Sequence, residues 1–140
     1  MLVEEKIVDK TMFVYTGVST ANEARALGLA AINEKLAVCA DFWPISSVYP
    51  WNGVIQDVDQ HMLVLTTKHS LSVKLVNFVN EIHSYSIPCV ASFEVAFMNP
   101  PYSFWVDKTL EGKDDYVSLD EEKRMEKNKE EGGYHAGHLK

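Results

Sequence analysis

Apolar and polar residues alternate with two different periods along the first part of the chain. Residues 10–18 (KTMFVYTGV) form an apolar and aromatic run that reaches a glycine near its end, which predicts a buried strand. Residues 19–36 follow with a helical pattern, and Thr20 and Glu23 have the spacing of a capping box at its start. Gly28 lies inside this alanine-rich segment, so we expect the helix to pack close to a sheet. The apolar positions at helical spacing are Ala24, Leu27 and Ala31.

Residues 37–68 change to a strand pattern, in which Val, Phe, Trp, Ile and Tyr recur between polar residues. This pattern predicts a long β-hairpin. The pair Asn52-Gly53 favours a type I′ turn, and the acidic segment 56–60 (QDVDQ) is an alternative place for the turn. Pro44 and Pro50 cannot donate ladder hydrogen bonds, so we expect the first arm at a sheet edge or a bulge.

Three further elements complete the pattern. Residues 70–85 have a helical apolar face, and Pro88 predicts that this helix stops by about Tyr85. Residues 89–97 alternate as a strand. Residues 99–110 open with prolines, which are tolerated in the first turn of a helix.

The resulting order, β-α-β-β-α-β with a short C-terminal helix, predicts an α+β fold of the ferredoxin-like type. In that fold four antiparallel strands carry two helices on one face. With the strands in the order 4-1-3-2, Cys39 and Cys89 fall on opposite edges of the sheet. We therefore expect that these cysteines do not meet within one protomer.

The composition changes after Leu110. Residues 111–140 are nearly all charged residues and glycine, with too few apolar side chains to offset the entropy of ordering them. We therefore assign residues 1–110 to one folded domain and residues 111–140 to a charged C-terminal tail. Within the tail, residues 119–130 have a helical pattern, and His135 and His138 form an isolated HxxH.

Bulk properties narrow the classes of function. The net charge is -7 and the pI about 5.1, which disfavours nucleic acid as a partner. No segment is apolar enough for a membrane span, and the first ten residues lack the apolar core of a secretion signal. Two cysteines without a CxxC motif exclude a disulfide scaffold. We expect a cytoplasmic protein with reduced thiols.

His83 is the strongest candidate for chemistry among the five histidines. At the predicted end of a helix it would be a metal ligand, a general base, or a polar residue stabilised by the helix dipole. No set of nucleophile, base and orienting residue accompanies it, and GxSxG, P-loop and GxGxxG motifs are absent. We therefore predict that the protein is not an enzyme.

Aromatic residues gather on the hairpin and on the last predicted helix. A small two-layer domain has few core positions for so many large rings, and Trp and Tyr are enriched in protein interfaces. A long hairpin also leaves an unpaired edge, which a second subunit would cover. These residues therefore favour an oligomer interface. They are Phe42, Trp43, Tyr49, Trp51, Tyr102, Phe104 and Trp105.

Four segments in this order resemble the CutA divalent-cation-tolerance family. They are EKLAVCADFWPISSVYPWNGVI (34–55), LVLTTK (63–68), IHSYSIPCVASFEV (82–95) and NPPYSFWV (99–106). The resemblance covers about residues 11–110. It implies a ferredoxin-like homotrimer whose hairpins pair across subunits, akin to the PII signalling proteins, and a non-catalytic role in tolerance of divalent metal ions and copper.

The resemblance also implies where ligands would bind. The family's copper site combines a cysteine at the end of the first strand with two helix-end histidines, and these positions hold Thr16, Ile82 and His83 here. The sequence establishes no cofactor, and a divalent metal or copper is the candidate ligand. The predicted metal ligands are His83, Cys39 and Cys89. The predicted lining of an intersubunit cleft is Tyr49, Trp51, Lys68, His83 and Tyr85.

Two other functions stay open at this point. The cleft would serve a PII-like sensor of a small anionic metabolite if binding depends on Lys68 and not on copper. An enzyme that uses His83 as general base is the third possibility.

We predict that a chain ending at Leu110 folds and assembles like the full chain, because residues 111–140 offer little apolar surface to pack. Circular dichroism and light scattering on both chains test this. A truncated chain that does not assemble would show that the tail docks on the domain.

Overall fold

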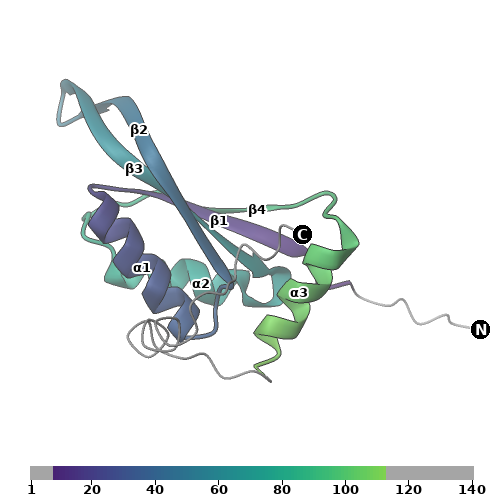
Figure 1. Ribbon diagram of the computed structural model, residues 1–140. Coiled ribbons are helices and arrows are strands. Elements are labelled where there is room, and N and C mark those ends of the chain that lie inside the picture. The colour runs from purple at the N-terminus through teal and green to yellow at the C-terminus, as the bar shows by residue number, and fades with distance from the viewer. Residues whose placement is uncertain (1–7, 113–140) are drawn as a thin grey trace, which may run out of the picture.

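A four-stranded antiparallel sheet carries two helices on one face, and a third helix lies at one end of it (Figure 1). The computed structural model describes residues 8–112. The elements are β1 (Thr11–Val18), α1 (Ala21–Asn33), β2 (Cys39–Trp51), β3 (Val54–Lys68), α2 (His69–Ile82), β4 (Val90–Glu94) and α3 (Pro100–Leu110). The predicted βαββαβ order with a C-terminal helix is confirmed. The predicted tail helix 119–130, His135 and His138 lie outside the described residues.

The strands lie in the order β2-β3-β1-β4, as predicted. Cys39 begins one edge strand and Cys89 immediately precedes the other, so the expectation that they lie on opposite edges is confirmed. Pro44 and Pro50 both lie in β2, where an edge position leaves one side of the backbone free of a ladder.

The core lies between the sheet and the two helices α1 and α2. Alternate residues of β1 and β3 point toward the helices, because successive side chains of a strand face opposite sides. Leu63, Leu65 and Leu75 are fully buried there and provide the largest apolar side chains of the core. Among the helices in the described part of the chain, none has the length and hydrophobicity that a membrane crossing requires.

Local chemistry accounts for the ends of the helices. Glu23 donates its backbone N–H to Thr20 Oγ1 at 3.0 Å, which confirms the predicted cap of α1. This helix ends at Asn33, three residues before the predicted limit, and Lys35 follows with a positive φ of 59°. The helix α2 ends at Ile82 because His83 is extended, with ψ 144°.

The hairpin turn lies at Asn52-Gly53. Both residues have positive φ, 51° and 79°, as a type I′ turn requires. The alternative turn at 56–60 is wrong, since these residues pair with β2 inside the long strand β3.

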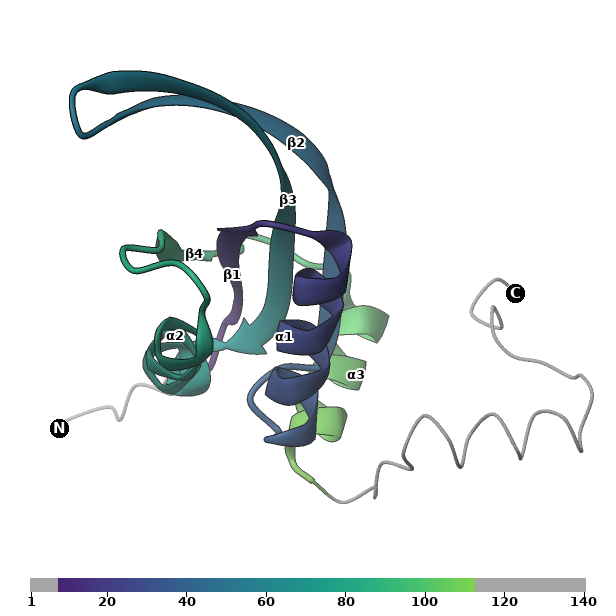
Figure 2. The same ribbon diagram turned by 90° about the vertical axis from the view of Figure 1, so that its left-hand side faces the viewer.

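The hairpin extends well beyond the sheet. The strand β1 pairs only with residues 61–68 of β3, so residues 45–51 and 54–60 pair only with each other in the described part of the chain. We call these two segments the overhanging ribbon. Figure 2 shows the ribbon bending over the sheet face that α1 and α2 leave open.

The helix α3 covers one end of this open face. Lys68 and Thr66 share that face, and Thr66 is buried although α1 and α2 pack on the opposite side. The ammonium group of Lys68 lies 3.1 Å from the carboxylate of Asp107 in α3 and 3.6 Å from that of Asp9. Val106 is the buried residue of α3.

We predict that Gly28→Ala destabilises the protein, although alanine favours a helix by about 1 kcal/mol. A Cβ at residue 28 would lie 2.5 Å from the Cβ of Ala40 in β2, so α1 would have to move away from the sheet. We expect the free energy of unfolding to fall by about 1–3 kcal/mol in a denaturant titration. The control is Ala26→Gly on the exposed side of α1, which reports helix propensity alone. A stabilised Gly28→Ala protein would contradict the close packing.

Candidate functional site

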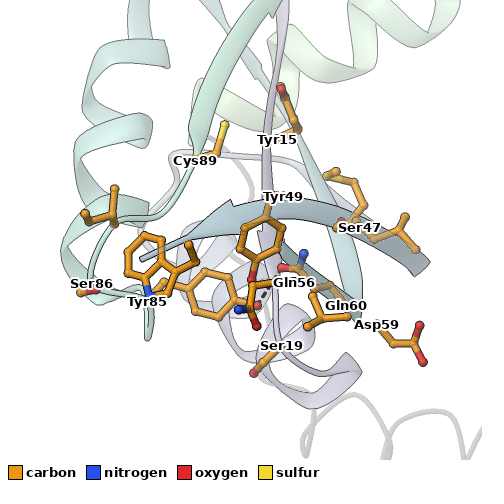
Figure 3. A pocket seen from close by; sticks show the side chains of 16 residues that line it. Tyr15, Ser19, Ser47, Tyr49, Gln56, Asp59, Gln60, Tyr85, Ser86 and Cys89 are labelled. Atoms are coloured by element: carbon orange, nitrogen blue, oxygen red, sulfur yellow. Dashed lines mark hydrogen bonds between the residues drawn. The ribbon is translucent and has the colours of Figure 1, made fainter. Parts of the chain in front are cut away.

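A cavity of about 650 Å³ lies beneath the bend of the overhanging ribbon (Figure 3). Its walls come from the end of β1, the ribbon strands β2 and β3, and the loop between α2 and β4. It opens on the sheet face that α1 and α2 do not cover. Its volume is within the usual range of small-molecule sites.

The cavity is lined by aromatic rings, aliphatic side chains and polar groups, and Asp59 is the one charged side chain among the described lining residues. The aromatic residues are Tyr15, Tyr49, Trp51 and Tyr85. The side-chain amides of Gln56 and Gln60 add donors and acceptors, and the hydroxyl of Tyr85 donates to Gln60 Oε1 at 2.8 Å. Apart from Asp59, the lining combines stacking surface with hydrogen-bonding groups that carry no charge.

His83 holds the wall that carries Tyr85. The backbone N–H of Tyr85 donates to His83 Nδ1 at 3.1 Å, so this nitrogen is an acceptor. His83 Nε2 lies 3.0 Å from the Gly17 carbonyl oxygen and 3.0 Å from Thr16 Oγ1. A carbonyl oxygen only accepts, which assigns the proton to Nε2 and makes the ring neutral. Both nitrogens are therefore engaged within the protomer.

Glu23 holds the same loop from α1. Its carboxylate accepts from the Ser84 backbone N–H at 3.2 Å, and from the backbone N–H and hydroxyl of Ser19 at 3.0 and 2.8 Å. Burial by itself would raise the pKa of Glu23. The hydrogen bonds from Ser84 and Ser19 outweigh burial and lower this pKa below its ordinary value.

The two cysteines have different surroundings. Cys39 lies beside α3, where its sulfur is 3.6 and 3.7 Å from the two carboxylate oxygens of Asp41. Burial, followed by the Asp41 charge, raises the pKa of this thiol, so it stays protonated. Burial, followed by the charge of Cys39, raises the pKa of the adjacent Tyr102 to about 12. Cys89 is exposed and lines the cavity beside Tyr15.

Lys68 lies in a separate cluster. Its ion pairs with Asp9 and Asp107 tie the chain before β1 to α3. Asp9 also accepts the backbone N–H of Ser70 at 2.8 Å and its hydroxyl at 2.6 Å, at the start of α2. Burial opposes ionisation of Asp9, but the bonds from Ser70 and the charge of Lys68 lower its pKa. Lys68 therefore has a structural role in this protomer.

The structure brings together three of the five residues predicted for the cleft. Tyr49, Trp51 and Tyr85 line the cavity, His83 supports its wall from behind, and Lys68 is outside it. Assignment of the five to a cleft between subunits stays a prediction.

The predicted metal ligands His83, Cys39 and Cys89 also stay a prediction. Cys39 and Cys89 belong to opposite sheet edges. Within residues 8–112, no three His, Cys, Asp or Glu side chains gather as a potential metal site.

Sequence reasoning missed Tyr15, Gln56 and Gln60. The alternation of side chains along each strand, combined with the observed register, places Tyr49 opposite Gln56 and Ile45 opposite Gln60 on the open face. The alternation of side chains was visible in the sequence. The pairing register of β2 and β3, however, depended on the position of the hairpin turn, for which the sequence left two alternatives.

Comparison with known proteins places the chain in a family. The family model described as CutA1 divalent ion tolerance protein matches residues 12–109. "Protein CutA" of Mus musculus is 33% identical over 89 residues, which cover 63% of this chain and 50% of the mouse protein. "Protein CutA, chloroplastic" of Arabidopsis thaliana is 31% identical over 97 residues, which cover 69% and 53%. The chain thus spans about half the length of these relatives.

A solved structure agrees. The crystal structure of CutA1 from Oryza sativa has a TM-score of 0.69 and 30% sequence identity, with 72% of this chain and 94% of the rice chain covered.

We predict that Glu23 contributes to the acid sensitivity of folding. A group whose pKa is lowered in the folded state stabilises the fold above its unfolded pKa, about 4.3 for glutamate. This stability is lost as the pH falls through the folded pKa. Glu23→Gln should lower the free energy of unfolding by about 1 kcal/mol at pH 7 and flatten its fall below pH 5. Denaturant titrations at several pH values measure both. An unchanged acid dependence would exclude this role, and Glu34→Gln, at the other end of α1, is the control.

Proposed function

The chain belongs to the CutA1 divalent ion tolerance protein family and is a homologue of the divalent-cation tolerance proteins, and we propose that it acts as a non-catalytic homotrimer in the response to divalent metal ions. We further propose that the cavity beneath the ribbon becomes a cleft between subunits in this trimer. The proposed compartment is the cytoplasm. The name of the Arabidopsis relative assigns that protein to the chloroplast.

The overhanging ribbon is the observation that supports the trimer. Residues 45–51 and 54–60 form a two-stranded ribbon, and a ribbon of two strands alone is at best marginally stable in water. The ribbon exposes large apolar side chains, among them Val48, Val54 and Ile55. Neighbouring subunits that pair with its free edge would satisfy the backbone and cover these side chains.

The open face of the sheet supports the same proposal. Phe13, Tyr15 and Phe93 form a ring cluster on it, with centroids 5.8 and 5.9 Å apart, and Phe93 is half exposed. Trp43 is also half exposed on this face. Aromatic rings held together at the surface are typical of interface cores.

The metal proposal depends on Thr16 and His83. Their side chains lie 3.0 Å apart, so the position of the family's strand-end cysteine is adjacent to the remaining helix-end histidine. A threonine hydroxyl is a poor ligand for Cu(I), which prefers thiolate, thioether and imidazole. We propose weak copper binding that depends on His83. A thiol from a neighbouring subunit would strengthen this binding, and Cys89 is the exposed cysteine among the described residues.

We predict that sedimentation velocity shows a trimer at micromolar concentration and that Ile55→Asp weakens it at least tenfold. Ile55 is 68% exposed on the ribbon, so a carboxylate there costs little in a monomer but is unpaired in an interface. The matched control is Val73→Asp on α2, where Val73 is 72% exposed. A stable monomer, or equal sensitivity of both sites, would contradict the proposed assembly.

We predict that Thr16→Cys combined with Ile82→His raises Cu(I) affinity by at least about tenfold, because it restores a thiolate and an imidazole beside His83. Competition with a Cu(I) chelator measures the affinity. His135 and His138 should be alanine in every protein compared, so that the tail histidines do not contribute. His83→Ala should abolish the gain. Tight binding by the parent chain that survives His83→Ala would show that another residue is the ligand.

A further inference from the structure

The cavity beneath the ribbon offers nothing to neutralise an anion. No lysine, arginine or histidine is among the described residues that line it. Lys68, the cation that an anionic metabolite would need, is engaged by Asp9 and Asp107 outside the cavity. An anion that enters would lose hydration without gaining a charged partner, which is costly.

The cavity has no carboxylate directed at its rings among the described lining residues (Figure 3), and a cation bound tightly there would need one. Asp59 is the one acidic residue among the described lining residues, and its carboxylate accepts a hydrogen bond from Ser46 at 3.1 Å. Figure 3 shows this carboxylate directed away from the rings of Tyr49 and Tyr85. The phenols of Tyr15 and Tyr85 have raised pKa values and stay neutral. Burial, followed by the charges of Glu23 and Tyr49, raises the pKa of Tyr85. The charge of the neighbouring Cys89 raises the pKa of Tyr15.

What remains is an uncharged surface of rings and amides. Tyr49 and Tyr85 lie together at one side of the cavity in Figure 3, and Trp51 adds an indole to its lining. Aromatic rings stack on flat ligands in offset or edge-to-face arrangements. Gln60 Oε1 accepts from Tyr85, while its Nε2 has no hydrogen bond within the described part of the chain. Within residues 8–112, Gln56 Nε2 donates only one long bond, of 3.4 Å to the Val54 carbonyl, so it can exchange this bond for one to a ligand.

We propose that this cavity binds an uncharged, flat heteroaromatic molecule. Its ring would pack against Tyr49, Trp51 and Tyr85, and its polar edge would bond to the amides of Gln56 and Gln60. The proposal names the ligand class of the cleft in the proposed trimer and therefore rests on that function. It replaces the anionic metabolite that Lys68 suggested, because the structure assigns Lys68 to another cluster.

Three indoles that differ in charge test the proposal on the full-length protein. Indole-3-acetamide is neutral, indole-3-acetate anionic and tryptamine cationic at pH 7. Isothermal titration calorimetry should show that the amide binds at least tenfold more tightly than either charged compound. It should also slow alkylation of Cys89 by iodoacetamide, as peptide mass spectrometry shows, since Cys89 is exposed in the cavity wall. Alkylation of Cys39, outside the cavity, should not change.

Matched variants locate the site. Trp51→Ala should weaken the amide at least fivefold, whereas Trp105→Ala should not, although both tryptophans are 44% exposed. Gln56→Lys adds a cation inside the cavity and should reverse the preference toward indole-3-acetate. Val73→Lys adds the same charge on α2, where Val73 is 72% exposed and outside the cavity, and should leave the preference unchanged. Thermal melts verify that each variant folds.

Sedimentation of the same samples separates the two proposals. A trimer that binds none of the three compounds, or binds a charged one as tightly as the amide, overturns the ligand class and leaves the assembly standing. A monomer overturns the proposed function, whatever it binds. A trimer that prefers the amide, with protection of Cys89, supports both.

Discussion

A β-ribbon that extends past its own sheet is the constraint on which the rest of this structure depends. Residues 45–51 and 54–60 satisfy each other's hydrogen bonds on one side only, and the β2 edge has no partner in the described part of the chain. Backbone groups at this edge can form hydrogen bonds to water. The exposed valine and isoleucine side chains of the ribbon are instead unfavourable in water, because apolar surface is stabilised by burial. We propose that a neighbouring subunit completes this ribbon. This ribbon arches over the aromatic open face of the sheet (Figure 2), and the cavity lies beneath its bend.

The loop after α2 gives the cavity its fixed wall. His83 uses one nitrogen for the Tyr85 backbone and the other for the end of β1, and Glu23 accepts the Ser84 backbone N–H from the start of α1. Three segments distant in the chain are thus joined at one point. The same arrangement brings Thr16 to His83, whose Nε2 lies 3.0 Å from the threonine hydroxyl.

Much of the fold was predictable from local signals. The Thr20 to Glu23 cap, the Asn52-Gly53 pair and the prolines of β2 each act within a few residues, so the pattern alone indicated element order and the edge position of β2. The site was harder to predict from the sequence than the fold. Lys68 was expected in the cleft, but its partners Asp9 and Asp107 come from distant segments whose approach depends on how α3 packs. The neutral lining also depends on register, which sets the face on which Gln56, Asp59 and Gln60 each point.

Hydrogen exchange of the ribbon amides tests the central claim most directly. If neighbouring subunits complete the ribbon, amides of residues 45–51 and 54–60 in the full-length protein should exchange as slowly as those of β1 in the core. Their protection should also fall on dilution, as dissociation exposes the edge. Ribbon amides that exchange within seconds at every concentration, while β1 stays protected, would contradict the account. The ribbon would then be a free hairpin.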